Sequence, residues 1–178
     1  MLTQQVVLVD LDDNKIGVGE KMAVHREGVL HRAFSIFIVN KHNEMLLQQR
    51  ALSKYHSGGL WTNACCSHPM PNETLEQAVK RRLHEEMGFY CPMKKIFHFT
   101  YNEQLDNDLV EYEFDHVFLG TYNSRTINVN QQEVEDYGYF SIDAIDTWLK
   151  RASEEFTCWF NIAYPKVREY LAGSGRHR

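Results

Sequence analysis

Long apolar runs are missing from this chain, and no stretch approaches the roughly 20 residues that a membrane-spanning helix requires. Residues 1–5 also lack a basic region followed by an apolar run, so we expect no signal peptide. Basic residues do not predominate, because the net charge is −5 and no basic stripe carries interleaved aromatic residues. We therefore expect neither nucleic acid nor a membrane as a partner. A small anionic molecule remains compatible with a local basic pocket.

Cysteine is scarce and irregularly placed. The chain has four cysteines, at positions 65, 66, 91 and 158, and the adjacent pair would rarely form a disulfide. No disulfide framework is therefore expected, and a cytoplasmic, reducing location fits best. A chain of 178 residues, 43% of them hydrophobic, can bury a core without such cross-links.

The chain has no linker, repeat or low-complexity stretch, which predicts a single domain over residues 1–172 and a disordered tail at 173–178. Apolar and alternating stretches predict strands at 6–11, 33–39, 45–49, 96–103, 109–122 and 134–140, with one more short strand after a turn at 12–15. Helical spacing predicts helices at 20–26, 74–87, 141–153 and 159–171. Strands and helices do not alternate regularly, so the expected class is α+β.

The segment Trp61-Thr62-Asn63-Ala64-Cys65-Cys66-Ser67-His68-Pro69 carries the most chemical information. In an extended segment, Cys66 and His68 point to the same face because side chains alternate with period two. Cys65 then points away from both. The segment therefore predicts a thiol, able to serve as nucleophile or proton donor, beside a metal ligand.

The helix at 74–87 and the residues before it carry a second pattern. Thr74 and Gln77 make a capping box, and Gly88 is the expected stop. Glu73, Arg81 and Glu85-Glu86-x-Gly88-Phe89 resemble the Nudix box, G-x5-E-x7-R-E-U-x-E-E-x-G-U, in which acidic side chains hold a divalent cation that neutralises a diphosphate.

Two residues depart from that box: Ser67 replaces its first glycine and Arg82 replaces a carboxylate. A guanidinium in place of a metal ligand predicts a site that binds a diphosphate without necessarily cleaving it. A solvated charged helix face is the alternative for such Glu and Arg residues.

Histidines and carboxylates suggest a further metal site. His25 and His31 are expected to be brought together by a turn, and strand alternation places Glu111 and Glu113 on one face. With His68 they form a plausible five-ligand set for Zn, Mn or Mg. Each histidine taken alone is more often a surface residue, and paired acids on a strand are more often simply solvated.

Seven motifs in order resemble type I isopentenyl diphosphate isomerases, the Nudix-fold branch of that activity, over about residues 6–170. They are Glu20-Lys21-x3-His25, Leu30-His31-Arg32-Ala33-Phe34-Ser35, Gln49-Arg50-Ala51-x-Ser53-Lys54, the segment 61–69, Ala78-x2-Arg81-Arg82-Leu83-x2-Glu86-x-Gly88, Glu111-x-Glu113 and Glu133-Val134-x-Asp136-Tyr137. The resemblance implies a Nudix-type mixed sheet flanked by helices, with an N-terminal extension.

The resemblance also implies roles for individual residues. Cys66 and Glu113 would be the catalytic pair, with Tyr101 assisting Glu113. A tightly bound Mn²⁺, Zn²⁺ or Mg²⁺ would be held by His25, His31, His68, Glu111 and Glu113. Glu86 and the Cys66 carbonyl would help to place a Mg²⁺ on the diphosphate. Diphosphate oxygens would be bound by Lys21, Arg50, Lys54 and Arg82, and Trp159 would face the hydrocarbon.

The implied reaction moves a double bond by adding a proton at one end of an allylic unit and removing one at the other. The substrate would be a small diphosphate of isoprenoid synthesis, and we expect a monomer or a weak dimer. Two alternatives remain. One is a Nudix hydrolase of a nucleoside diphosphate derivative, against which Arg82 argues. The other is a non-enzymatic metal-binding or regulatory domain, against which the density of candidate catalytic groups argues.

Overall fold

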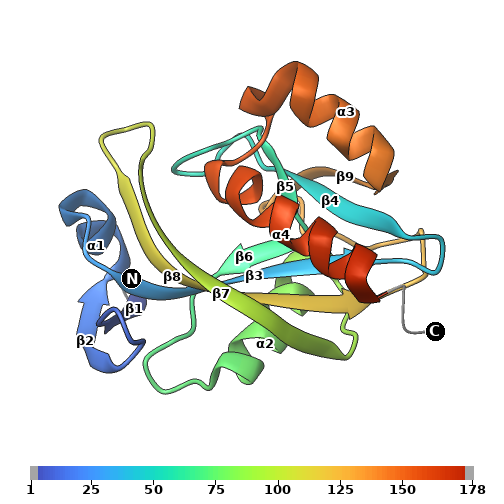
Figure 1. The fold of residues 1–178 in the computed structure, drawn as a ribbon. Helices are drawn as coiled ribbons and strands as arrows, with labels where there is room; N and C mark the ends of the chain where they lie inside the picture. The colour runs from blue at the N-terminus through green and yellow to red at the C-terminus, as the bar shows by residue number, and fades with distance from the viewer. Residues whose placement is uncertain (1–3, 175–178) are drawn as a thin grey trace.

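The structure, a computed structural model, describes residues 4–174, and within them one mixed sheet of nine strands carries helices on both faces (Figure 1). The strands are β1 (Gln5–Val9), β2 (Lys15–Glu20), β3 (His31–Val39), β4 (Glu44–Arg50), β5 (Trp61–Asn63), β6 (Cys65–Ser67), β7 (Met93–Gln104), β8 (Val110–Thr121) and β9 (Val134–Ser141). The helices are α1 (Lys21–Glu27), α2 (Leu75–Met87), α3 (Ile142–Ala152), the short 3₁₀ helix η1 (Ser153–Glu155) and α4 (Cys158–Ser174). The predicted α+β class is confirmed.

The central strand is β3, which pairs with β1, β4, β6 and β8. Along its whole length β3 runs parallel to β8, from His31 opposite Glu113 to Val39 opposite Thr121. On its other edge β3 runs antiparallel to β6, with Ser35 opposite Cys66. Side chains of β6 and β8 that point to the same face therefore stand on either side of β3.

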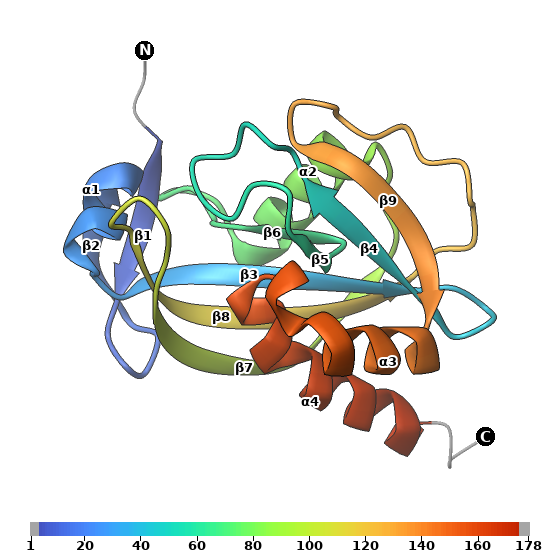
Figure 2. The same cartoon turned by 90° about the horizontal axis from the view of Figure 1, so that it is seen from above.

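Helices α2 and α4 lie on opposite faces of the sheet (Figure 2), and an apolar core lies under each of them. Ile36 and Ile38 of β3 pack with Leu83 of α2 on one face. Phe37 packs with Phe160 of α4 on the other face. Because strand side chains alternate, an apolar β3 supplies both cores.

Local signals set the ends of α2. The Thr74 hydroxyl accepts a hydrogen bond from the Gln77 amide, and the Gln77 side chain accepts one from the Thr74 amide. Gly88 ends the helix at a φ of 73°, where a Cβ would lie 2.2 Å from the Asn128 carbonyl oxygen. The predicted capping box and glycine stop are both confirmed.

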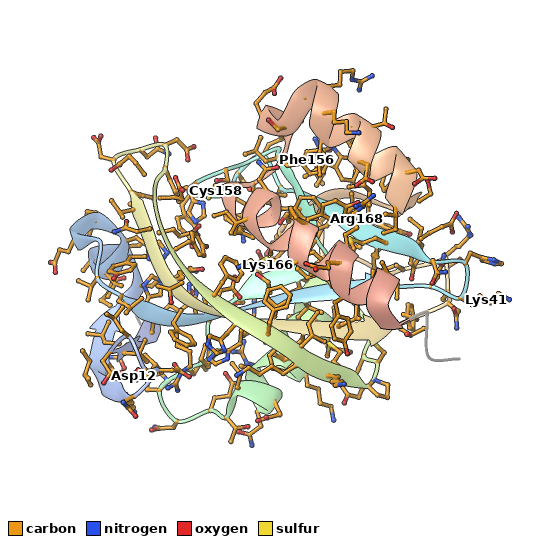
Figure 3. The ribbon with its side chains drawn as sticks, in the orientation of Figure 1. Asp12, Lys41, Phe156, Cys158, Lys166 and Arg168 are labelled. Atoms are coloured by element: carbon orange, nitrogen blue, oxygen red, sulfur yellow. The ribbon has the colours of Figure 1, made fainter. Side chains whose placement is uncertain are left out.

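The last two helices cover the second core. Ser141 caps α3, as predicted, and Pro165 lies inside α4, where it leaves the Asn161 carbonyl without its usual helical donor. Lys166 of α4 lies over the Phe99 ring of β7, 5.3 Å from its centroid (Figure 3). No helix within residues 4–174 is both long enough and apolar enough to cross a membrane.

Helix α4 continues to Ser174, two residues into the segment predicted to be a disordered tail. Gly173 is exposed, and a Cβ there would meet no atom within 4 Å, so this residue faces solvent. The rest of that predicted tail, 175–178, lies outside the described residues.

The first two strands and α1 form an N-terminal unit, residues 5–27, at one end of the sheet (Figure 1). The β1–β2 turn is held to the sheet by Asp13. Arg32 Nε donates to Asp13 Oδ1 over 2.7 Å, and His116 Nε2 lies 2.9 Å from Asp13 Oδ2. This contact fixes the unit that carries Lys21 and His25 into the site.

Candidate active site

The two adjacent cysteines point to opposite faces of the sheet because β6 is extended. Cys65 is fully buried in the core under α2. Cys66 points to the α4 face and lines a small cavity of about 40 Å³ together with His68. The structure therefore confirms the predicted alternation of side chains in this segment.

Three side chains contact the Cys66 sulfur. Sγ donates to Asn63 Oδ1 over 3.1 Å and accepts from the Trp159 indole N–H over 2.9 Å, and Ser35 Oγ lies 3.5 Å away. Burial, together with the nearby charge of Asp115, raises the pKa of the Cys66 thiol far above its usual range. At neutral pH the thiol is therefore protonated, and its hydrogen bonds hold it in one orientation.

The acceptor atom of Asn63 is itself fixed. Its Nδ2 donates to the carbonyl oxygens of Ile36 and Cys65, both over 2.9 Å, so Oδ1 must face Cys66. Thr62 Oγ1 also donates to that oxygen. Asn63 lies in the recognised segment, yet sequence reasoning gave it no role, because its function depends on contacts across strands.

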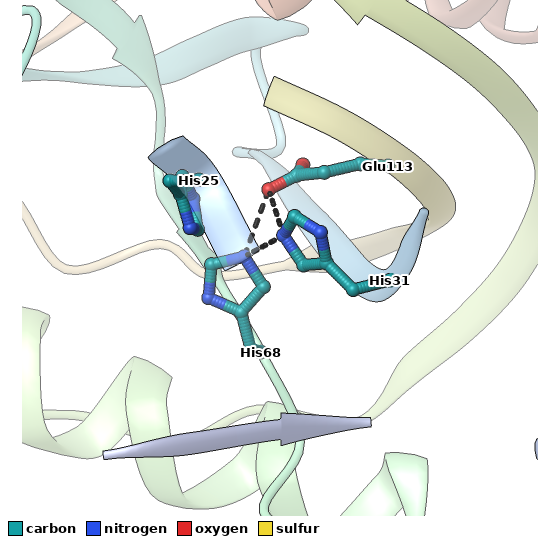
Figure 4. Close-up of side chains that lie close together, drawn as sticks. All are labelled: His25, His31, His68 and Glu113. Carbon is teal, nitrogen blue, oxygen red and sulfur yellow. Dashed lines mark hydrogen bonds and ion pairs between the residues drawn. The ribbon is translucent and has the colours of Figure 1, made fainter. Parts of the chain in front are cut away.

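Four of the five predicted metal ligands come together in one buried cluster: His25, His31, His68 and Glu113 (Figure 4). Nε2 of His68 lies 2.8 Å from Glu113 Oε1 and 3.2 Å from Nε2 of His31. Nδ1 of His31 donates to the Val29 carbonyl oxygen, which leaves Nε2 for the cluster. Burial lowers the pKa of His25 to about 4 and that of His68 to about 3, so both rings are neutral at pH 7.

These residues fit a divalent metal ion. Nδ1 of His25 donates to the Lys21 carbonyl oxygen over 2.7 Å, and the buried Nε2 of the same ring has no hydrogen-bond partner. A buried lone pair without a partner is costly, and a cation supplies one. Burial opposes ionisation of Glu113, but the nearby His31 and His68 rings hold the pKa of its carboxyl well below its usual range. Neutral imidazoles and one carboxylate are an ordinary donor set for such an ion.

Glu111, the fifth predicted ligand, lies beside this cluster but outside it. Its Oε1 is 3.3 Å from Nε2 of His56, and with His25 these residues make a second buried group of donors. The Tyr101 hydroxyl lies 3.0 Å from Glu111 Oε2 and 2.7 Å from Glu113 Oε2. Burial and the charge of Glu113 raise the pKa of Glu111.

All four predicted phosphate-binding cations line the cavity: Lys21, Arg50, Lys54 and Arg82. Burial, and then the charges of Lys54 and Arg82, lower the pKa of Lys21 to about 8. Lys54 pairs with Glu133, and Arg82 contacts Glu133, Glu85 and Glu86. A cluster of cations whose mutual repulsion depresses a lysine pKa is suited to a polyanion.

Glu86 is buried behind this surface and does not line the cavity. Gln48 Nε2 donates to its Oε2 over 2.9 Å, and Arg82 pairs with its other oxygen. Trp159 does line the cavity, with the Arg50 guanidinium 5.2 Å from its ring centroid.

Sequence reasoning missed further residues that line the cavity, among them Tyr55, His56 and Asp115. Asp115 continues the alternation of Glu111 and Glu113 and accepts from the Ser35 hydroxyl over 2.7 Å, so period two could have found it. His56 lies in the loop 51–60 between β4 and β5, where no periodicity indicates which side chains turn inward.

Comparison with known proteins first defines the class: residues 29–160 match the model of the NUDIX domain. The fold agrees, because a Deinococcus radiodurans protein, DR0079, superposes with a TM-score of 0.69 over 83% of this chain and 90% of its own, at 16% identity. The NUDIX domain of Shewanella oneidensis NrtR superposes with a TM-score of 0.62 over 80% of this chain and 87% of its own, at 18% identity. The N-terminal unit precedes the matched region.

Sequence relatives narrow the class. A Photorhabdus laumondii protein named isopentenyl-diphosphate Delta-isomerase 2 is 46% identical over 170 residues, which cover 93% of this chain and 96% of the relative. A Pectobacterium atrosepticum protein named isopentenyl-diphosphate Delta-isomerase is 47% identical over 93% of this chain and 92% of the relative. The chain belongs to the isopentenyl-diphosphate Delta-isomerase family.

Proposed function

We propose that this protein interconverts isopentenyl diphosphate and dimethylallyl diphosphate, a step of isoprenoid synthesis, in the cytoplasm and as a monomer or weak dimer. The names of its relatives support the reaction. The observation that carries it is the placement of Cys66 and Glu113. They stand on β6 and β8, on either side of β3, and both line one cavity.

The reaction needs two proton-transfer groups on opposite sides of an allylic unit. Protonation of the terminal methylene carbon leaves a tertiary carbocation, and removal of a proton from the carbon two positions away gives the new double bond. Cys66 is held as a thiol and Glu113 as a carboxylate, so one group carries a proton and the other can accept one. Each turnover exchanges their protonation states, and the reverse reaction uses them in opposite roles.

Tyr101 and Asn63 keep the two groups in place. The Tyr101 hydroxyl contacts the Glu113 oxygen that faces away from the histidines. Asn63 accepts a hydrogen bond from the thiol, which holds the Cys66 side chain in one position before the substrate binds. Such preorganisation removes an orientational cost from the transition state.

His25, His31, His68 and Glu113, with Glu111 beside them, would hold a tightly bound Mn²⁺ or Zn²⁺, or Mg²⁺. When bound, that ion supplies positive charge that stabilises the Glu113 carboxylate and tunes its basicity. The histidines serve as neutral donors, and hydrogen bonds to backbone carbonyl oxygens orient His25 and His31.

Lys21, Arg50, Lys54 and Arg82 would bind the diphosphate, and Glu86 with the Cys66 carbonyl would help to hold a Mg²⁺ bound to it. Their charges hold the diphosphate and orient the hydrocarbon toward the two proton-transfer groups. The Trp159 ring, which is almost fully buried, excludes water from the carbocation and offers it a π face worth roughly 2 kcal/mol.

Incubation with isopentenyl diphosphate and a divalent metal tests this proposal. We expect dimethylallyl diphosphate to form with no inorganic phosphate released. The competing hypothesis, a Nudix hydrolase, predicts cleavage of a nucleoside diphosphate derivative and no isomerisation. Arg82 argues against hydrolysis, because its guanidinium replaces a box carboxylate and neutralises Glu86.

A further inference from the structure

His56 is locked in place against the candidate metal cluster. Its side chain is 2% exposed, and Nδ1 meets the Ser57 hydroxyl at 3.2 Å. Its ring lies against His25 on one side and edge-on to Trp159 on another, with centroid distances of 6.1 and 6.0 Å. Arg50 fixes its backbone by donating to the His56 carbonyl oxygen over 3.1 Å. These contacts leave Nε2 as the ring atom available to the cavity.

The Nε2 atom of His56 approaches a carboxylate without bonding to it. It lies 3.3 Å from Glu111 Oε1, yet among the hydrogen bonds of residues 4–174 none joins these two atoms. The neighbouring cluster shows the same relation, because Nε2 of His31 lies 3.4 Å from Glu113 Oε1. In each pair the nitrogen and the oxygen lie close together without being aligned for a hydrogen bond, so the lone pairs of both atoms point toward a common position. That arrangement is typical of ligands that share an ion.

His25 belongs to both groups of donors. It lies within 4.8 Å of His56 and Glu111, and within 4.8 Å of His31, His68 and Glu113. Its Nδ1 hydrogen bonds to the Lys21 carbonyl oxygen, so the ring has a single lone pair to offer, at the partnerless Nε2. One lone pair serves one ion, and the two groups therefore surround one metal position rather than two.

We propose that His56 is a ligand of this metal, so that the centre draws on six side chains: His25, His31, His56, His68, Glu111 and Glu113. The inference rests on the metal centre of the proposed function and adds a ligand to it. Opposite donors at about 2.1 Å from an ion stand about 4.2 Å apart. Donor atoms within each group lie within 4.8 Å of one another, so each group can close on an ion, and binding one ion would draw His56 and Glu111 toward the other four ligands.

Four imidazoles and two carboxylates have consequences for the ion. Imidazole-rich sets favour Mn²⁺ to Zn²⁺ over Mg²⁺, which prefers oxygen ligands and keeps several waters. A set of six protein donors also leaves no position for a bound water. The centre would hold and tune Glu113 without producing hydroxide, which suits a pocket that must protect a carbocation.

Counting the imidazole ligands of the full chain loaded with Co²⁺ tests the proposal. In the ¹H NMR spectrum, each ligating ring gives one exchangeable N–H signal shifted far outside the normal range. We expect four such signals in the wild type and three in His56→Ala. His42→Ala, which removes an exposed turn histidine, should keep all four.

Chelator competition gives a second readout: His56→Ala should lose Co²⁺ at least about tenfold more readily than the wild type. His56→Gln can still donate a hydrogen bond to Glu111 but should show three shifted signals, and it replaces the alanine variant if that one does not fold. Three signals in the wild type, unchanged in both His56 variants, would overturn the assignment and leave the metal centre intact. A wild type without any shifted signals would remove the metal centre itself.

Discussion

At the scale of single residues, Cys65 and Cys66 have the same side chain but opposite surroundings. Cys65 packs in the apolar core under α2, whereas Cys66 contacts Asn63, Ser35 and Trp159 at the cavity. The difference arises because β6 is extended and consecutive side chains point to opposite faces. The pair is therefore a matched internal control for the catalytic assignment.

We expect Cys66→Ala to reduce kcat for isomerisation at least about 10³-fold, since a proton-transfer group is lost. Cys65→Ala should keep most of the activity and lose about 1 kcal/mol of stability, because one methylene-sized group leaves the core. Steady-state assays and urea unfolding of both variants measure these effects. Equal activity of the two variants would refute the role of Cys66.

Period-two alternation was enough to predict which way Cys66, Glu111 and Glu113 point, and family resemblance predicted the cations around them. Alternation did not predict that Glu111 groups with His56 and His25 rather than with His31 and His68. That choice depends on how loop 51–60 folds back, which no local pattern encodes. The roles of Cys66, Glu113 and Tyr101 stay predictions until variants are assayed.

At the scale of elements, the N-terminal unit brings Lys21 and His25 to the site from outside the NUDIX match. Its β1 strand pairs with β3 at a single position, Leu8 opposite His31. The Asp13 contacts with Arg32 and His116 therefore supply much of its polar anchoring. Sequence patterns predicted the strands and the helix of this unit, but this anchor spans residues far apart in the chain.

Asp13→Asn should weaken this anchor by about 1–2 kcal/mol, because two partly buried cationic or polar partners lose a carboxylate. Asparagine tolerates the left-handed backbone of this position, which has a φ of 64°. The weakening therefore measures the lost charge and not backbone strain. Asp12→Asn changes an exposed carboxylate at the same turn and should have little effect (Figure 3). Hydrogen exchange should quicken in α1 but not in α4. Equal hydrogen-exchange rates in α1 of the two variants would show that Asp13 does not anchor the N-terminal unit.

Elements with strong local signals were predicted well, and the two shortest strands were not. The α2 helix carried a capping box, an apolar stripe and a glycine stop, and its predicted bounds are confirmed to within one residue. Strands β5 and β6 have three residues each, too few for periodicity to identify as strands. Their pairing with β4 and β3 decides their conformation.

At the scale of the whole molecule, four buried histidines couple stability to pH. Burial lowers the pKa of His25 and His116 to about 4, of His68 to about 3 and of His56 to about 2. The unfolded chain, with histidine pKa values of about 6.5, binds more protons below that pH. Each histidine therefore lowers stability as pH falls from about 6.5 toward 4.

We expect the metal-free protein to lose stability on acidification from pH 7 to 5, measured by urea unfolding in the presence of a chelator. Each histidine contributes at most about 1.4 kcal/mol per pH unit. Glu111 and Asp115, whose pKa values burial raises, act in the opposite direction and offset part of the loss. Stability that is constant or rises over this range would show that the histidines are not held neutral.

The central claim is that two protein groups exchange protons with the hydrocarbon while the diphosphate stays intact. Incubation of the wild type with isopentenyl diphosphate and divalent metal in D₂O, followed by ¹H and ²H NMR, tests it directly. We predict that deuterium enters the allylic positions of both isomers and that no inorganic phosphate appears. Isomerisation without deuterium uptake, or phosphate release without isomerisation, would contradict the account.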